Sequence, residues 1–202
     1  MIAALLSIAL LAQALPPAPA AALDPGAPSL TPQQAALDAR MRTYFAGEKN
    51  EGWAWLGVSL AATGASAGLM AASGDAAHGA SYPLVDVGLV QLAASIYLLV
   101  HTGTQIDDRA AQIRRDPCAF LDTETKRMHG VLTRLHIATL VEALALAGGA
   151  GMAGAGATEH RDFLQGAGWG LVAQSVTMLV FDGFAATRAE EYERDLKSAS
   201  CH

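Results

Sequence analysis

Charged residues are scarce in this chain: Asp, Glu, Lys and Arg make up 16% of its 202 residues, against roughly a quarter in a typical soluble domain. Aromatic residues are also few, at 6%, whereas Ala and Gly are abundant. The net charge is −6 and no basic stripe occurs, so nucleic acid is not expected as a partner. Little charge and many small residues are typical of helices that pack closely in lipid.

Familiar catalytic and metal-binding patterns are missing as well. The chain has two cysteines, and neither CxxCH nor HExxH occurs in it. No Ser-His-Asp ordering, Gly-rich phosphate loop or paired carboxylates indicate a reaction centre. We therefore expect no enzymatic activity and no cofactor.

Four long runs nearly free of charge stand out: 52–74, 87–106, 135–157 and 163–181. The one charged residue within them is Glu142. Each run approaches the ~20 residues that a helix needs to cross hydrocarbon about 30 Å thick. None shows the polar face that a soluble helix of this length repeats about every 3.6 residues. The sequence predicts an all-α integral membrane protein with four transmembrane helices.

One pattern occurs twice, 80 residues apart. The stretch "LLVHTG" (98–103) ends the second run, and "MLVFDG" (178–183) ends the fourth. The same offset superposes the run boundaries and the charged segments that follow, 107–134 and 188–197. We interpret the chain as two tandem helical hairpins, an internal repeat in parallel orientation. The second and fourth helices are expected to continue beyond the membrane.

The segments outside the runs divide the rest of the chain. Residues 1–22, an apolar stretch followed by Pro and Ala, predict a secretory signal peptide. Residues 23–50 form a Pro/Ala-rich linker and a polar helix that is expected to start at Thr31-Pro32, since Pro suits a first helical position. The transmembrane bundle covers 51–198, and 199–202 is a tail.

Two rules of membrane orientation conflict in this sequence. A cleaved signal peptide would place a multi-pass protein in the cell membrane with its charged segments outside the cytoplasm. Short links between the runs are expected around Asp75–Pro83 and Thr158–Asp162, and of the 13 Lys and Arg residues these links hold Arg161 alone. Positive residues normally stay cytoplasmic, which favours the opposite orientation. We retain the orientation that the signal peptide predicts.

Glu142 is the most informative polar residue of the runs. A carboxylate inside a span costs about 2.5–3.5 kcal/mol on insertion scales, so such residues usually face the bundle interior and carry function. If Arg134 pairs with Asp182 at the membrane boundary, antiparallel packing places Glu142 and Gln174 at one depth, about 12 Å further in. This pair is a candidate proton or small-ion site, and a structural hydrogen bond between the two is the alternative.

Two histidines lie toward the same membrane face, because His101 ends the second run and His136 begins the third. Histidines on adjacent helices could ligate the iron of haem b from both sides or, with Asp182, bind a metal. Hydrogen bonding at the membrane interface explains the same residues without any cofactor.

Small residues one helical turn apart occur at Gly64-x-x-x-Gly68 and Gly166-x-x-x-Gly170. Such pairs let helix backbones approach closely, either in a homodimer or within one bundle. We expect packing within the bundle.

The two cysteines, Cys118 and Cys201, fall in charged segments on one side of the membrane. In an oxidising compartment they could form a disulfide that ties one hairpin to the other.

Without a reaction centre, the function expected from the sequence is association in the lipid bilayer. The protein would act as a scaffold or accessory subunit, as a homodimer or with another membrane protein, through its extended charged helices. An electron carrier with haem between His101 and His136, or a proton or small-ion pathway through Glu142, are the alternatives.

Overall fold

The computed structural model describes residues 30–199, which form four long helices. They are α2 (Pro32–Ala71), α3 (Asp75–Arg115), α4 (Pro117–Thr158) and α5 (Asp162–Ser198). Each is long and apolar enough to cross a membrane, so the prediction of an all-α protein with four such helices is confirmed. The predicted signal peptide, most of the linker and Cys201 lie outside the described residues.

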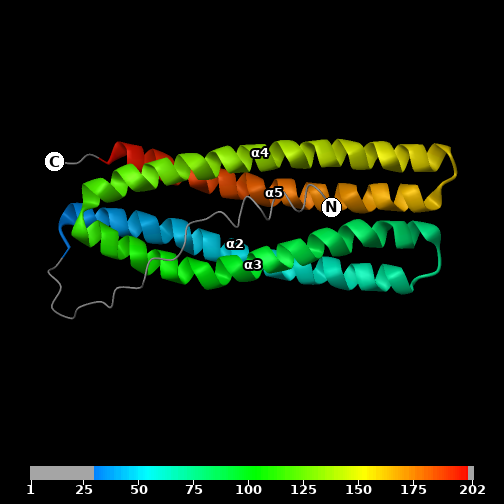
Figure 1. Ribbon diagram of the computed structural model, residues 1–202, viewed down its shortest axis with the longest axis horizontal. Coiled ribbons are helices and arrows are strands. Elements are labelled where there is room, and N and C mark those ends of the chain that lie inside the picture. Colours follow the sequence, from blue (N-terminus) through cyan, green and yellow to red (C-terminus); the bar gives the residue numbers. More distant parts are fainter. Residues whose placement is uncertain (1–29, 200–202) are drawn as a thin grey trace.

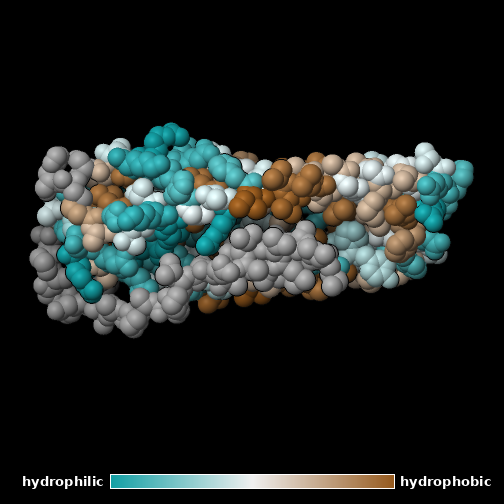
Figure 2. All heavy atoms as spheres, turned by 45° about the horizontal axis from the view of Figure 1, so that its top comes forward, coloured by the Kyte–Doolittle hydropathy of each residue, from teal (hydrophilic) through white to brown (hydrophobic). Residues whose placement is uncertain are grey.

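The helices run alongside one another in alternating direction (Figure 1). α2 packs along α3 and α4 along α5, and the contact between α3 and α5 joins the two halves. One end of the bundle holds residues 30–51, 107–134 and 182–199, and is called here the charged end. The other, the loop end, carries the turns at 72–74 and 159–161. Figure 2 shows hydrophilic side chains gathered over the charged end and a hydrophobic band across the middle.

The helix starts follow local capping chemistry. The Thr31 hydroxyl accepts a hydrogen bond from the Gln34 N–H, and the Gln34 side chain accepts one from the Thr31 N–H (3.0 Å). These two bonds satisfy backbone donors that the first turn of a helix leaves free, and they confirm the predicted start. Asp116 caps α4 similarly, since its carboxylate accepts from the N–H groups of Cys118 and Ala119, both at 3.0 Å.

The first link lies elsewhere than predicted. The chain turns at 72–74, and Asp75–Pro83 belongs to α3, with Pro83 inside the helix. Gly74 makes the short turn possible, because its φ of 134° is one that residues with a side chain rarely adopt. Pro83 removes one backbone hydrogen bond, a loss that neighbouring helices in a membrane bundle can offset. The second link, 159–161, lies within the predicted range.

All four helices extend into the charged end, not only the second and fourth. α2 begins at Pro32 and α4 at Pro117, each well before its apolar run. The charged segment between α3 and α4 is therefore helical on both sides of its break at Asp116. A core of large apolar residues holds this end together, built on Met41, Phe45, Ile113, Phe120, Met128 and Leu196, all fully buried.

Contacts between α2 and α3 fix how these two helices are positioned relative to each other along the bundle axis. Gly52 lies against Leu99, and the hydroxyl of Ser66 donates to the carbonyl of Ser81 (2.8 Å). The first apolar run of α2 therefore lies opposite residues 75–99 of α3. Toward the loop end the contacts involve mostly small residues, so the backbones approach closely.

The two predicted small-residue pairs have opposite surroundings. A Cβ on Gly166 would lie 1.9 Å from the carbonyl oxygen of Ala76, and one on Gly170 would lie 2.6 Å from that of Ala80. This pair packs α5 on α3, as expected for packing within the bundle.

The other pair, Gly64 and Gly68, points outward. Both glycines are exposed, and nothing lies within 4 Å of a Cβ built on either. The expected role within the bundle therefore does not hold for this pair.

Candidate functional site

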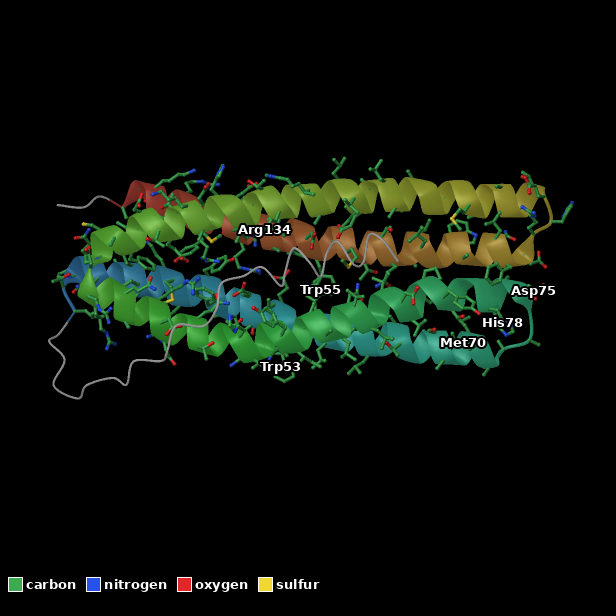
Figure 3. The ribbon with its side chains drawn as sticks, in the orientation of Figure 1. Trp53, Trp55, Met70, Asp75, His78 and Arg134 are labelled. Carbon is green, nitrogen blue, oxygen red and sulfur yellow. The ribbon has the colours of Figure 1, made fainter. Side chains whose placement is uncertain are left out.

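A cavity of about 260 Å³ lies where the charged end meets the apolar part of the bundle. All four helices line it, with four carboxyl side chains and two guanidinium groups: Glu48, Glu51, Glu142, Asp182, Arg134 and Arg188. Figure 3 labels two of the lining residues, Arg134 on α4 and Trp55 on α2, which mark its position along the bundle. Most of the remaining lining is apolar.

Glu142 and Asp182 form the central pair of this cavity. Their side chains lie close enough to interact directly, and two carboxyl groups in contact can share one proton in a hydrogen bond. Glu142 is only 7% exposed, and its Oε2 has no hydrogen-bond partner within residues 30–199. Repulsion between two ionised carboxylates in contact favours the state in which one of them holds a proton. The pair is therefore a candidate site for one proton shared between two carboxyl groups.

The predicted partner of Glu142 was Gln174, and the structure corrects this pairing. Gly156 of α4 packs against Gln165 of α5. Because α4 and α5 are antiparallel, a residue that precedes Gly156 on α4 faces one that follows Gln165 on α5 by the same number of residues. For Glu142, this count reaches the turn of α5 that carries Asp182. The helices are thus displaced by more than one turn from the predicted register, because small residues at the loop end set how far α4 and α5 slide past one another.

Arg134 and Asp182, the predicted structural pair, both line the cavity, and their pairing stays a prediction; Asp182 also interacts with Glu142. Gln174 is 4% exposed and does not line the cavity. Its Nε2 has no hydrogen-bond partner in the described part of the chain.

Glu48, Glu51 and Gln91 were not singled out from the sequence, yet all three line the cavity. Glu51 forms an ion pair with Arg188, which neutralises that arginine and joins α2 to α5. Gln91 is 1% exposed, and its Nε2 donates to the sulfur of Met178 (2.9 Å). Gln91 carries the one side-chain amide between His101 and the loop end of α3, a signal that the sequence did offer.

Four buried polar atoms of the lining have no hydrogen-bond partner among the residues described. They are Oε2 of Glu48, Oε1 of Gln91, Oε2 of Glu142 and Nε of Arg188. An unpaired buried polar group costs about 1–3 kcal/mol, so such groups call for a guest molecule, an ion or water. Three of the four are acceptors, which favours a guest that donates hydrogen bonds or carries positive charge.

The two histidines lie away from this site. The ring of His101 stacks on Tyr97 of the same helix, with 4.9 Å between centroids, and His136 is exposed. They belong to α3 and α4, which contact each other little, and neither lines the cavity. Within residues 30–199 no group of three or more His, Cys, Asp or Glu side chains is placed to hold a metal ion.

A second buried carboxylate, Glu124, lies among the aromatic residues of the charged end. It accepts hydrogen bonds from Arg127 Nη2 (2.7 Å) and Arg109 Nε (3.2 Å), and the Tyr192 hydroxyl donates to it at 3.4 Å. Burial alone would raise the pKa of Glu124, but the hydrogen bond and charge of Arg127, together with Arg109, bring that pKa below its usual value. This cluster joins α3, α4 and α5.

The predicted disulfide involves Cys118, which lies in the first turn of α4, and Cys201, which lies outside the described residues. The pairing stays a prediction.

Comparison with known proteins gives no match: no family model, no curated protein and no solved structure is significantly similar to this chain.

Proposed function

We propose that this protein binds a small monovalent cation in its cavity in exchange for the proton shared by Glu142 and Asp182. The observation that carries the proposal is the pair of neighbouring carboxyl groups, Glu142 and Asp182, in a cavity lined by all four helices. Carboxyl groups inside a membrane bundle commonly mark ion or proton pathways.

The exchange balances one charge against one charge. With its proton, the pair carries a single negative charge. When a monovalent cation enters and the proton leaves, two carboxylates and one cation remain, and the net charge of the site is unchanged. A cation that entered while the proton stayed would lose its water shell to a site of weaker negative charge. Release of the proton therefore lowers the free-energy cost of binding the cation.

The free acceptors of the cavity favour a cation there, which they would contact directly or through water. One oxygen atom each of Glu48, Gln91 and Glu142 lacks a partner in the described part of the chain, and the positive charge of Arg188 is already neutralised by Glu51. A hard ion such as Na⁺ and a small ammonium ion both prefer oxygen acceptors. Tyr44 and Trp55 also line the site. The faces of their aromatic rings attract organic cations.

Proton release on cation binding tests this function directly. Purified protein in weakly buffered detergent with a pH indicator should release up to one proton per chain when Na⁺, ammonium or methylammonium chloride is added. N-methylglucamine chloride, which is too large, controls for ionic strength. Glu142→Gln and Asp182→Asn should each abolish the release, because an amide has no proton to give at neutral pH.

Glu190→Gln provides the matched control, since Glu190 is an exposed carboxylate on α5 outside the cavity. It should release protons as the wild type does. Equal release from Glu142→Gln and wild type, or no release by folded wild-type protein with any of the three cations, would contradict the proposal.

The hairpin duplication that the sequence predicts would place the site at the junction of two halves, as in transporters built from repeats. Positions that the 80-residue offset equates, Gly88 with Gly168 and Ser95 with Ser175, are buried in both halves. We propose that the cavity lies between two copies of one ancestral hairpin.

Association in the bilayer is the second candidate function, and the outward glycines favour it. Gly64 and Gly68 leave a smooth exposed strip on α2, against which another helix could pack closely. As a scaffold or accessory subunit, the protein would use this strip in addition to its charged helices.

A further inference from the structure

Asp86 lies on the outer face of the bundle in the middle of its apolar part. Gly88, half a turn away, packs against Thr63 of α2, and Thr63 is the midpoint of the uncharged run 52–74. The side chain of Asp86 is exposed. A membrane that covers the uncharged parts of α2 and α5 therefore has Asp86 at about its centre.

The membrane cannot be shifted along the bundle to avoid this carboxylate. The contact of Gly52 with Leu99 sets the position of α2 relative to α3. A membrane moved toward the charged end would therefore bury Glu48, Lys49 and Glu51 of α2 in lipid before Asp86 lay outside it. A carboxylate facing lipid is among the costliest groups in a span. Within the described residues no cation or hydrogen-bond donor of this chain contacts it.

The face that carries Asp86 is otherwise apolar, and no helix among residues 30–199 covers it. Its exposed residues follow one another at intervals of four and three: Tyr82, Asp86, Leu89, Ala93 and Ile96. This is the spacing with which one helix packs along another. A single polar residue in such a seam fixes which helix binds and in what register.

We propose that this face of α3 docks a transmembrane helix of a different protein that carries a Lys or Arg at mid-membrane depth. Charge complementarity selects the partner, because the cation neutralises Asp86 and each group removes the other from lipid. A second copy of this chain does not supply the cation. Every Lys and Arg lies at the charged end except Arg161, which lies at the loop end.

A synthetic probe tests the docking face without knowledge of the natural partner. The full-length protein, fluorescently labelled and reconstituted in liposomes, is titrated with a labelled helix of about 20 Leu and Ala residues. One form of the helix has a single central Lys, and the matched form has Leu there. Energy transfer should show the Lys helix binding about tenfold more tightly than the Leu helix.

Variants assign the effect to Asp86. Asp86→Asn should remove the preference for Lys, whereas Asp75→Asn at the loop end should retain it. Three results would overturn the proposal: no preference in the wild type, a preference that survives Asp86→Asn, or a dimer of the protein alone that Asp86→Asn dissociates. A preference lost in Glu142→Gln but kept in Asp86→Asn would place the cation in the cavity. Proton release by the cavity is independent of Asp86, so the two proposals can fail separately.

Discussion

Glu124 and Glu142 are both buried carboxylates on α4, but their neighbours differ in charge. Glu124 lies between two arginines and a tyrosine hydroxyl, so its ionised form is fully bonded. Glu142 faces another carboxyl group, an arrangement that favours one proton shared between the two. The first arrangement stabilises the fold, and the second leaves a group that can change its state.

Glu124→Gln should lower the free energy of unfolding by about 3–5 kcal/mol, because it leaves two arginine side chains without their buried counter-ion. The folded-state pKa of Glu124 is lowered from 4.5. Its contribution is therefore present above that value and is lost as the pH falls through the lowered pKa. Thermal unfolding in detergent between neutral and acidic pH should show this loss in the wild type and not in the variant.

Asp122→Asn is the control for that measurement. Asp122 pairs with Lys126 at 2.7 Å, but both side chains are largely exposed, and exposed pairs contribute about 0–1 kcal/mol. A destabilisation as large as that of Glu124→Gln would show that charge, not burial, determines the effect.

At the level of single residues, the sequence allowed some predictions and not others. The cap at Thr31 and the inward position of Glu142 follow from local rules, since capping depends on the next few residues and a carboxylate in a span avoids lipid. The partner of Glu142 depends on how α4 and α5 slide past one another. That register is set by contacts such as Gly156 on Gln165, which no local pattern reports.

At the level of helices, identical motifs have different roles. Gly64-x-x-x-Gly68 and Gly166-x-x-x-Gly170 read alike in sequence, but one faces outward and the other meets α3. Pro83 similarly indicated a link, and it lies within α3. Helix existence and apolar length could be predicted from composition, whereas the direction that each glycine faces depends on the rotation of the helix within the bundle.

Gly166→Val and Gly64→Val form a matched pair that tests this difference. The first should destabilise the bundle by more than the 1–3 kcal/mol typical of overpacking, because its Cβ would overlap the backbone of Ala76. The second should change the unfolding midpoint little, since its side chain enters open space. Equal midpoints for the two variants in detergent would contradict the packing of α5 on α3.

At the level of the whole molecule, charge is distributed unequally between the two ends. All three lysines, Lys49, Lys126 and Lys197, lie at the charged end, and the loop end has Arg161. A membrane that covers the apolar part therefore separates nearly all the positive residues from the loops. The side of the membrane on which the lysine amines react therefore reports the orientation of the protein.

We expect the charged end to face outward, as a cleaved signal peptide requires. An amine-reactive reagent that does not cross membranes should then label all three lysines in intact cells, because they share one side. Labelling of all three only in inverted vesicles would mean that the positive residues are cytoplasmic and that the signal-peptide prediction is wrong. Labelling divided between the two sides would contradict the bundle itself.

The contact between α3 and α5 has a mechanical consequence. α2 packs mainly on α3 and α4 mainly on α5, and each of these two contacts is more extensive than the α3–α5 contact that joins the hairpins. A rocking movement of one hairpin against the other at the α3–α5 contact would therefore leave the most extensive packing intact. Because all four helices line the cavity, such a movement would change the space around Glu142.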